Sequence, residues 1–466
     1  MLNSADGSFV AALEARLGPA ALRPCKPADL EEPRGLFKGQ AAAVLQPATV
    51  AEVSTALAMC KAAHVPVVPL GGGTGLVGGQ IMESGPVPVV LSMERMTAIR
   101  DVSPDNNTMT VEAGAVLADI QVAAEEAGRM FPLRLASEGS CRIGGNLATN
   151  AGGVNVLRYG NMRDLCLGVE AVLADGTVVG GLKRLRKDNT GYDIRNLMVG
   201  SEGSLGVITA AVLRLFPRPK TLHTAFLAVP DPAAALALLH HLRASLGDTV
   251  SGFELIGKAG FEFLEETGFD LTSPFQETPE WSVLLELGGS AELAGALEQS
   301  LAEAIEAGLV DDALIAQNET QRLYFWQIRE TIPAANKRIG SISSHDISVP
   351  VSDVPRFIET ARAALPASLR VNCFGHMGDG NLHYNLFPPI GETRESYKNE
   401  RAALARCVFD VVADFGGSFS AEHGVGRLKT GDLQLYGDPG RLNAMRRIKT
   451  AFDPVGIMNP GVVLPL

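Results

Sequence analysis

Short runs of apolar and polar residues make up the first half of the chain, and glycine or proline separates most of them. Apolar residues at helical spacing predict a helix over 47–64, where Thr49 and Glu52 provide a T-x-x-E start. An apolar strand is predicted over 65–70, and a second helix over 116–127 that ends at a glycine. This half is therefore predicted to mix short helices with short strands.

Longer units follow residues 217–220, whose two prolines are typical of a linker. Strands separated by helices indicate an α/β or α+β domain built on one sheet. The predicted strands are 223–229, 250–255, 281–287, 346–349 and 369–374, and the predicted helices are 232–246, 291–307 and 395–415.

The composition excludes several classes of protein. The 466 residues are 46% apolar and 20% charged, which is a globular balance and enough for two or three domains. A net charge of −12 argues against a nucleic-acid binder. The chain has no run of about 18 apolar residues and no signal-like N-terminus, so neither a membrane span nor export is expected. Six scattered cysteines without a C-x-x-C pair indicate reduced thiols in a cytoplasmic protein.

Three glycine-rich segments lie in the first 210 residues, at 69–79, 136–160 and 187–209. The first follows a predicted strand, and its backbone N–H groups can converge on an anion as in a phosphate nest. It is not a G-x-G-x-x-G within a βαβ unit of a dinucleotide fold, and it lacks the G-K-[ST] ending of an NTPase loop. A structural bend is the alternative for each segment. One large phosphate-bearing ligand accounts for all three.

Two motifs near the C-terminus, 372–385 and 420–429, contain three of the eight histidines. His376 and His383 are seven residues apart, which on an uninterrupted strand would place them on opposite faces. The G-D-G between them permits a turn, after which both imidazoles can face one site. Two histidines and a carboxylate, here Glu422, are a common catalytic metal set. Histidines that bond only to the backbone are the alternative.

The combined motifs resemble the FAD domain of the vanillyl-alcohol oxidase and p-cresol methylhydroxylase superfamily, and most of all its branch of D-lactate, D-2-hydroxyglutarate and glycolate dehydrogenases. The resemblance implies an α+β fold, with a two-part FAD-binding domain of the vanillyl-alcohol oxidase type and an α/β substrate (cap) domain with an antiparallel sheet. The implied parts are an N-terminal helical segment at 1–36, the FAD-binding domain at 37–216, the substrate domain with the metal ligands at 217–420, and a C-terminal segment at 421–466 that returns to the FAD domain and completes the active site.

The resemblance also implies how FAD is bound. Covalent members attach the flavin through His or Cys, and the first glycine loop contains neither, so non-covalent FAD is expected, with Cys141 as the exception to consider. The implied cofactor-binding residues are Leu70, Gly71, Gly72, Gly73, Thr74, Gly75, Leu76, Ser137, Gly144, Gly145, Thr149, Gly152, Gly153, Tyr159, Glu202, Ile208 and Asn459.

For the reacting end of the substrate, the resemblance implies a divalent metal, with zinc expected, on His376, His383 and Glu422. His423 is the implied general base and a substrate contact, and an imidazole titrates near the neutral pH that suits this role. Arg329 and Asn385 match substrate-binding positions, and the planar fork of an arginine suits a carboxylate.

Two positions depart from members that act on D-2-hydroxyglutarate. Those enzymes carry Lys where this chain has Ser344 and a hydroxyl residue where it has Pro333, and both groups help to hold the distal carboxylate. The departures argue against a dicarboxylate substrate, unless Lys337 or Arg338 replaces the missing cation.

The expected function is a metal-assisted, FAD-dependent dehydrogenase that oxidises a D-2-hydroxy acid, of the D-lactate or D-2-hydroxyglutarate type, by hydride transfer to flavin. An oxidase similar to glycolate oxidase, an alkyl-transfer flavoenzyme and a flavin-binding subunit of a larger redox complex remain the alternatives. The expected electron acceptor is an electron-transfer flavoprotein, a quinone or a cytochrome, and a homodimer is compatible with the sequence.

Overall fold

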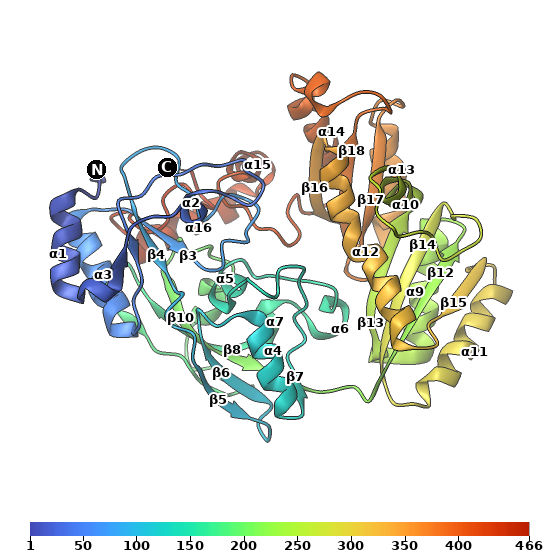
Figure 1. Ribbon diagram of the computed structural model, residues 1–466, viewed down its shortest axis with the longest axis horizontal. Helices are drawn as coiled ribbons and strands as arrows, with labels where there is room; N and C mark the ends of the chain where they lie inside the picture. Colours follow the sequence, from blue (N-terminus) through green and yellow to red (C-terminus); the bar gives the residue numbers. More distant parts are fainter. Residues whose placement is uncertain (466) are drawn as a thin grey trace. The chain divides into compact units, whose positions relative to one another are not determined.

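The computed structural model describes residues 1–465 and divides the chain into two compact units (Figure 1). Unit 1 comprises Met1–Gly152, Gly160–Arg218 and Glu422–Leu466, and unit 2 comprises Gly153–Tyr159 and Pro219–Ala421. The predicted boundaries after 216 and 420 lie within two residues of these divisions. Two differences from the sequence-based division are that residues 1–36 form part of unit 1 and that Gly153–Tyr159 belongs to unit 2.

Unit 1 contains a small sheet whose parallel strands carry the first glycine-rich segment. Its three parallel strands are fully or largely buried, which explains their continuous apolar sequence. Two helices pack together beside this sheet, and Thr49 begins the second of them by accepting the N–H of Glu52 at 3.2 Å. The strand order is β1 (Leu22–Arg23), β2 (Val44–Leu45), β4 (Val89–Ser92) and β3 (Val67–Leu70), and the helices are α1 (Gly7–Leu17) and α3 (Val50–Ala63).

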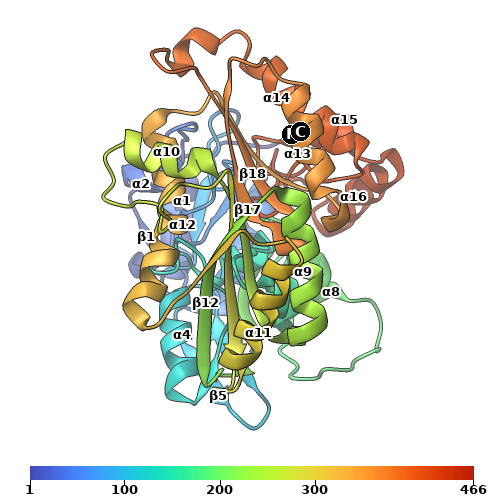
Figure 2. The same cartoon turned by 90° about the vertical axis from the view of Figure 1, so that its right-hand side faces the viewer.

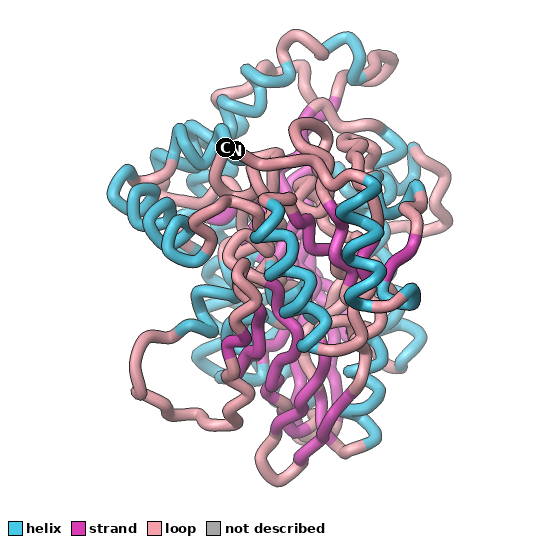
Figure 3. The backbone as a smooth tube through the Cα atoms, turned by 90° about the vertical axis from the view of Figure 1, so that its left-hand side faces the viewer, coloured by secondary structure: helices cyan, strands magenta, loops and turns pink. Residues whose placement is uncertain are grey.

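The second sheet of unit 1 is antiparallel, and a hairpin that turns at Asp175 and Gly176 forms one edge of it. Loops, drawn in pink in Figure 3, make up much of the unit around these strands. The strand order is β5 (Ile99–Ser103), β6 (Thr108–Glu112), β10 (Val207–Arg214), β8 (Cys166–Val172) and β9 (Val178–Val179). A separate two-stranded ribbon joins β7 (Arg129–Met130) and β11 (Phe216–Pro217). The helices are α2 (Pro27–Leu30), α4 (Leu117–Glu126), α5 (Ile143–Ala148), α7 (Met162–Leu165), α8 (Ile194–Met198), α15 (Thr430–Tyr436) and α16 (Pro439–Phe452).

Unit 2 is one seven-stranded antiparallel sheet with helices on both faces. The antiparallel sheet and the two-part FAD-binding domain predicted from the sequence are confirmed. The strand order is β15 (Asp312–Ile315), β12 (Thr221–Val229), β14 (Trp281–Gly289), β13 (Val250–Gly257), β17 (Arg370–His376), β18 (Asn381–Phe387) and β16 (Ser343–Ser348). The helices are α6 (Val156–Tyr159), α9 (Pro232–Leu246), α10 (Lys258–Glu266), α11 (Leu293–Glu306), α12 (Glu319–Ile339), α13 (Val354–Ala363) and α14 (Arg401–Asp414).

The helices of unit 2 give the two faces of the sheet different roles. Helices α9 and α11 lie side by side on one face (Figure 2). Helices α13 and α14 lie on the same face, where Phe357 of α13 contacts Tyr384 and Phe409 of α14 contacts His345. Helices α10 and α12 cover the opposite face, where a buried aromatic core surrounds Trp326. That second face also carries the two histidines of the predicted metal site. No helix among residues 1–465 is both long and apolar enough to cross a membrane.

Candidate functional site

The three glycine-rich segments meet in one pocket of unit 1, which contains about 950 Å³ of empty space counted to its open mouth. Among the predicted cofactor residues, those that line the pocket are Leu70, Gly71, Gly72, Gly73, Thr74, Gly75, Gly144, Gly145, Thr149, Glu202, Ile208 and Asn459. Within the described residues, the predicted positions that do not line it are Leu76, Ser137, Gly152, Gly153 and Tyr159. The last two lie in unit 2.

Glycine is required where the first two loops touch. A Cβ at Gly72 would lie 2.8 Å from the Cα of Cys141, and a Cβ at Gly71 would lie 3.2 Å from the Cα of Gly145. Gly73 adopts a left-handed φ of 72°. The loops therefore approach backbone to backbone and present a wall of backbone atoms to a ligand. A cradle of this kind at the end of parallel strand β3 fits the phosphate-bearing part of FAD.

The carboxylate of Glu202 ties the third glycine-rich segment to the segment that follows Glu422. Its two oxygens accept the N–H groups of Val425 and Gly426, each at 2.8 Å. Burial raises the pKa of Glu202 to about 6, although the two N–H donors act in the opposite direction. Asn459 adds a second link, because its side-chain amide donates to the carbonyl oxygens of Gly79 at 2.9 Å and Glu202 at 2.8 Å.

Two charged residues that the sequence reading missed hold the segment carrying Asn459. Asp453 accepts the N–H groups of Gly456, Ile457 and Met458 at 2.8–3.1 Å. The ammonium group of Lys449 donates to Asp453 at 2.6 Å and to the carbonyl oxygens of Ser204 and Met458 at 2.7 Å. The dipeptides D-P at 453 and N-P at 459 could have indicated this segment in the sequence, since both dipeptides mark turns. Other missed residues that line the pocket include Gln80, Arg142 and Asn146.

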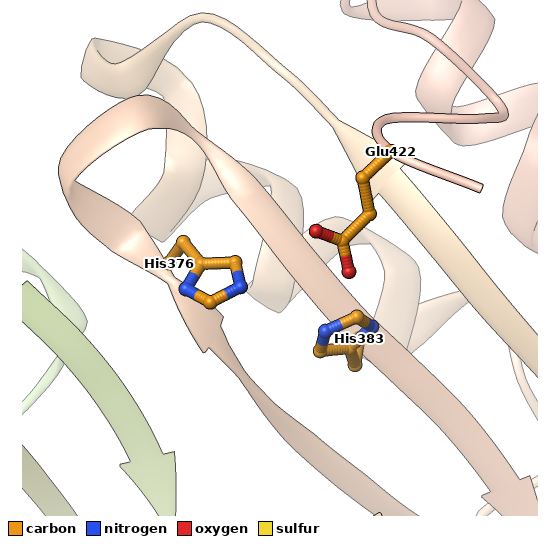
Figure 4. Close-up of side chains that lie close together, drawn as sticks. All are labelled: His376, His383 and Glu422. Carbon is orange, nitrogen blue, oxygen red and sulfur yellow. The ribbon is translucent and has the colours of Figure 1, made fainter. Parts of the chain in front are cut away.

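Two of the predicted metal ligands, His376 and His383, lie at a hairpin of unit 2. Strand β17 ends at His376, residues Met377–Asp379 form a 3-10 turn, and β18 begins at Asn381, so the G-D-G motif does turn the chain. His383 then pairs with Phe374 of β17, which brings both imidazoles to one face. The ligand atoms of His376, His383 and Glu422 all lie within 4.8 Å of one another (Figure 4).

Glu422 is placed by the residue before it, because the N–H of Ala421 donates to the carbonyl oxygen of Asp346 on β16 at 3.3 Å. Histidine nitrogens and carboxylate oxygens are the ligands that zinc takes in proteins. Two imidazoles and one carboxylate therefore fit a divalent metal.

His423, the next residue, lines the pocket of unit 1. Its Nε2 atom lies 3.7 Å from Oε1 of Glu422, and its side chain is 28% exposed. The residue is thus accessible to a small molecule while it stands beside a predicted metal ligand.

Arg329 is a buried residue of helix α12. Its Nε donates to Glu254 at 2.8 Å, and its guanidinium lies over the ring of Phe374, 4.8 Å from the centroid. Asn385 is also buried and lies two residues along β18 from His383, on the same face of the sheet. Two of the three predicted substrate-binding residues, Arg329 and Asn385, therefore lie at the face that carries the two histidines.

The two departures from the dicarboxylate pattern lie near this face. Ser344 is opposite Asn385 in the β16–β18 register and is exposed, and its hydroxyl is 2.8 Å from that of Ser341. Pro333 is exposed on α12, one turn after Arg329. Arg338 is held elsewhere, because its guanidinium donates to the carbonyl oxygen of Thr267 at 2.8 Å and lies over Phe269.

Two family models match the chain. The model described as "FAD binding domain" matches residues 41–180, and the model described as "FAD linked oxidases, C-terminal domain" matches residues 218–463. The first contains the glycine-rich segments at 69–79 and 136–160. The second contains both histidine motifs.

Curated proteins and solved structures agree with these models. The chain is 39% identical to the mitochondrial D-2-hydroxyglutarate dehydrogenase of Bos taurus, over 94% of this chain and 80% of that protein. It is 35% identical to the D-2-hydroxyglutarate dehydrogenase of Xanthomonas citri pv. viticola, over 90% of this chain and 88% of that protein. The fold is similar to p-cresol methylhydroxylase, with a TM-score of 0.73 at 16% identity over 98% of this chain and 96% of the other. It is also similar to 4-ethylphenol oxidase from Gulosibacter chungangensis, with a TM-score of 0.75 at 17% identity over 100% and 99% of the two chains.

Proposed function

Because the chain belongs to the FAD-linked oxidases, in the branch that includes the D-2-hydroxyglutarate dehydrogenases, we propose that it oxidises a D-2-hydroxy acid to the 2-oxo acid with the help of a divalent metal. The chain is an FAD-dependent 2-hydroxy acid dehydrogenase. Beyond this enzyme class, we propose the configuration of the substrate, the presence of the metal and the roles of the individual residues.

FAD would be held by the three glycine-rich segments and Asn459, which line one pocket. Bound FAD supplies the acceptor for a hydride. Non-covalent binding is supported by Cys141, which lines the pocket: burial raises the pKa of its thiol, which opposes the thiolate needed for attachment. Its hydrogen bonds act in the opposite direction but are the smaller effect.

A divalent metal, with zinc as the preferred candidate, would be held by His376, His383 and Glu422. Such an ion supplies Lewis acidity toward a hydroxyl oxygen. The proposal is supported by the donor set, because a merely structural role does not require two imidazoles and a carboxylate to converge.

The remaining roles belong to side chains of this chain. Arg329 binds the substrate carboxylate through the planar fork of its guanidinium. Asn385 contacts the substrate from the same face of the sheet. His423 takes the hydroxyl proton onto an imidazole nitrogen as the C–H bond of the substrate breaks. Proton and hydride leave on separate paths, so the substrate becomes a 2-oxo acid.

The substrate class we propose is a small D-2-hydroxy acid, with a monocarboxylate such as D-lactate accepted at least as well as D-2-hydroxyglutarate. Ser344 supplies no cation, and Arg338 is held against Thr267 and Phe269. A second carboxylate without a cationic partner is costly to desolvate. The relatives named for D-2-hydroxyglutarate support the 2-hydroxy acid class. The electron acceptor, a homodimer and a cytoplasmic location stay predictions.

The observation that carries the proposal is the convergence of His376, His383 and Glu422 beside His423. The test is a screen of D- and L-2-hydroxy acids with an artificial electron acceptor, before and after treatment with a chelator. We expect turnover of D-substrates that the chelator removes and added zinc restores. Turnover only with L-substrates, or turnover indifferent to complete metal removal, would contradict the proposal. Equal turnover with oxygen as sole acceptor would favour an oxidase.

A further inference from the structure

Glu254 lies on β13 in the middle of the sheet of unit 2 and has no exposed surface. A buried carboxylate is costly unless hydrogen-bonded charges or donors surround it. Glu254 is opposite His376 in the β13–β17 register. Because Glu254 is fully buried on a central strand, its carboxylate can only be paired by neighbouring residues of the fold.

Each oxygen of Glu254 has its own partner. Oε1 is 2.6 Å from Nδ1 of His376, and Oε2 accepts a hydrogen bond from Nε of Arg329 at 2.8 Å. Burial would raise the pKa of Glu254, but its contacts with His376 and Arg329 outweigh burial and lower the pKa to about 2. Both oxygens of this buried carboxylate are therefore engaged, one with His376 and one with Arg329.

The bond to Nδ1 decides which nitrogen of His376 can bind a metal. The two ring nitrogens point to opposite sides of the imidazole, and one of them faces Glu422 and His383 in Figure 4. With Nδ1 donating to Glu254, that nitrogen is Nε2. A carboxylate behind a metal-binding histidine fixes both its tautomer and its orientation.

The neighbouring strand provides an internal comparison. Glu286 of β14 is also buried, lies on the same face and pairs with an arginine of α12, because Arg322 donates to it at 3.1 Å. Arg322 and Arg329 are seven residues apart, about two helical turns. The second partner differs, however: Glu286 accepts the indole N–H of Trp326 at 2.7 Å, in the aromatic core. Thr224 donates to Glu286 as well, at 3.3 Å, so Glu286 joins structural residues, whereas Glu254 joins two residues of the proposed site.

We propose that Glu254 is a positioning residue that sets both the metal-binding face of His376 and the direction of the Arg329 guanidinium. The inference rests on the proposed function, because the roles of His376 and Arg329 come from it. A single buried carboxylate then couples the affinity for the metal to the binding of the substrate carboxylate.

Glu254→Gln tests this role with little change in volume. A glutamine offers one acceptor oxygen and places its NH₂ against the other donor, so it can serve His376 or Arg329 but not both. We expect Zn²⁺ to bind roughly 10- to 100-fold more weakly, the usual effect of losing a partner of a metal-binding histidine. The KM for D-lactate should rise as well, while the FAD content stays at one per chain. Zn²⁺ affinity is measured on the full FAD-loaded chain by competition with a chelator.

Glu286→Gln is the matched control, since it removes the same charge from the same face beside the same helix. Its Zn²⁺ affinity and KM should stay within about twofold of wild type, even where its thermal stability falls as much as that of Glu254→Gln. Equal Zn²⁺ affinities in the two variants would overturn the inference. Should Glu254→Gln fail to fold, Glu254→Asp serves instead: it keeps the charge but is one methylene too short to reach both partners. Wild-type Zn²⁺ affinity in that variant would overturn the inference too.

His383→Ala separates failure of the inference from failure of the proposed function. Zn²⁺ binding that His383→Ala leaves unchanged would overturn the proposed metal site and the inference with it. Zn²⁺ binding that His383→Ala abolishes and Glu254→Gln leaves unchanged would overturn the inference alone.

Discussion

The Nε2 atom of His423 lies 3.7 Å from Oε1 of Glu422, its neighbour in the sequence. Glu422 belongs to the group that can hold a metal, and His423 lines the pocket formed by the glycine-rich segments. One peptide bond therefore connects the proposed metal chemistry with the proposed proton transfer. The two residues are neighbours in the sequence but have different proposed roles, so single substitutions can test each role by itself.

His423→Asn should lower the rate of flavin reduction by roughly 10²–10⁴, the usual contribution of a positioned general base. Asparagine keeps a polar group of similar size but cannot take up a proton near neutral pH. FAD and metal content should not change, because His423 is not part of the proposed ligand set. Anaerobic stopped-flow measurement of flavin bleaching checks the rate.

The control is His240→Asn, because His240 is exposed on α9 and should leave the rate unchanged. Loss of metal from His423→Asn would mean that His423 is a ligand and not the base. A rate within threefold of wild type would remove it from catalysis.

Gly72→Ala should weaken FAD binding, because the added Cβ would lie 2.8 Å from the Cα of Cys141 and the two loops must separate. Overpacking of this kind costs about 1–3 kcal/mol, which corresponds to roughly 5- to 160-fold in affinity. Gly139→Ala is the matched control in the neighbouring loop, since a Cβ there meets nothing within 4 Å. FAD released by acid precipitation and measured per chain gives the occupancy of both variants. Flavin retained in the precipitate would contradict non-covalent binding.

His383→Ala and Glu422→Ala should each abolish bound metal and most activity while leaving FAD in place. The reason is that the proposed ligands and the glycine-rich pocket are built from different segments of the chain. Metal analysis of the purified variants provides the measurement. His223→Ala serves as the control, because the imidazole of His223 contacts Thr221, two residues away on the same strand. Wild-type metal content in either variant would remove that residue from the ligand set.

The local features of the fold could be predicted because their causes lie within a few residues. Helix α9 (Pro232–Leu246) has the bounds expected from its apolar spacing, and the cap at Thr49 is present. The turn between His376 and His383 also followed from the glycines between them. Each of these depends on spacing, capping or backbone freedom, which neighbouring residues determine.

Glu254 could not be identified in the same way. It lies in a strand of otherwise apolar and small residues, and its partner His376 is 122 residues away in the chain. Strand pairing of this range depends on the whole sheet, so no local pattern reveals it. The assignment of Gly153–Tyr159 to unit 2 is a second example, because the glycine-rich segment that contains it is continuous in sequence.

Ser344→Lys should raise kcat/KM for D-2-hydroxyglutarate and leave D-lactate unchanged. Ser344 is opposite Asn385 in the β16–β18 register, so a lysine there would extend from the edge strand beside a proposed substrate contact. A charge-assisted hydrogen bond to the distal carboxylate contributes about 1.5 kcal/mol, or roughly tenfold in kcat/KM. Lys337→Ala tests the competing cation, because Lys337 is exposed on α12, two turns after Arg329. If wild type strongly prefers D-2-hydroxyglutarate and Lys337→Ala removes that preference, Lys337 already binds the distal carboxylate. If Ser344→Lys changes both substrates equally, position 344 does not face the distal end, and the preference must be set elsewhere on the sheet.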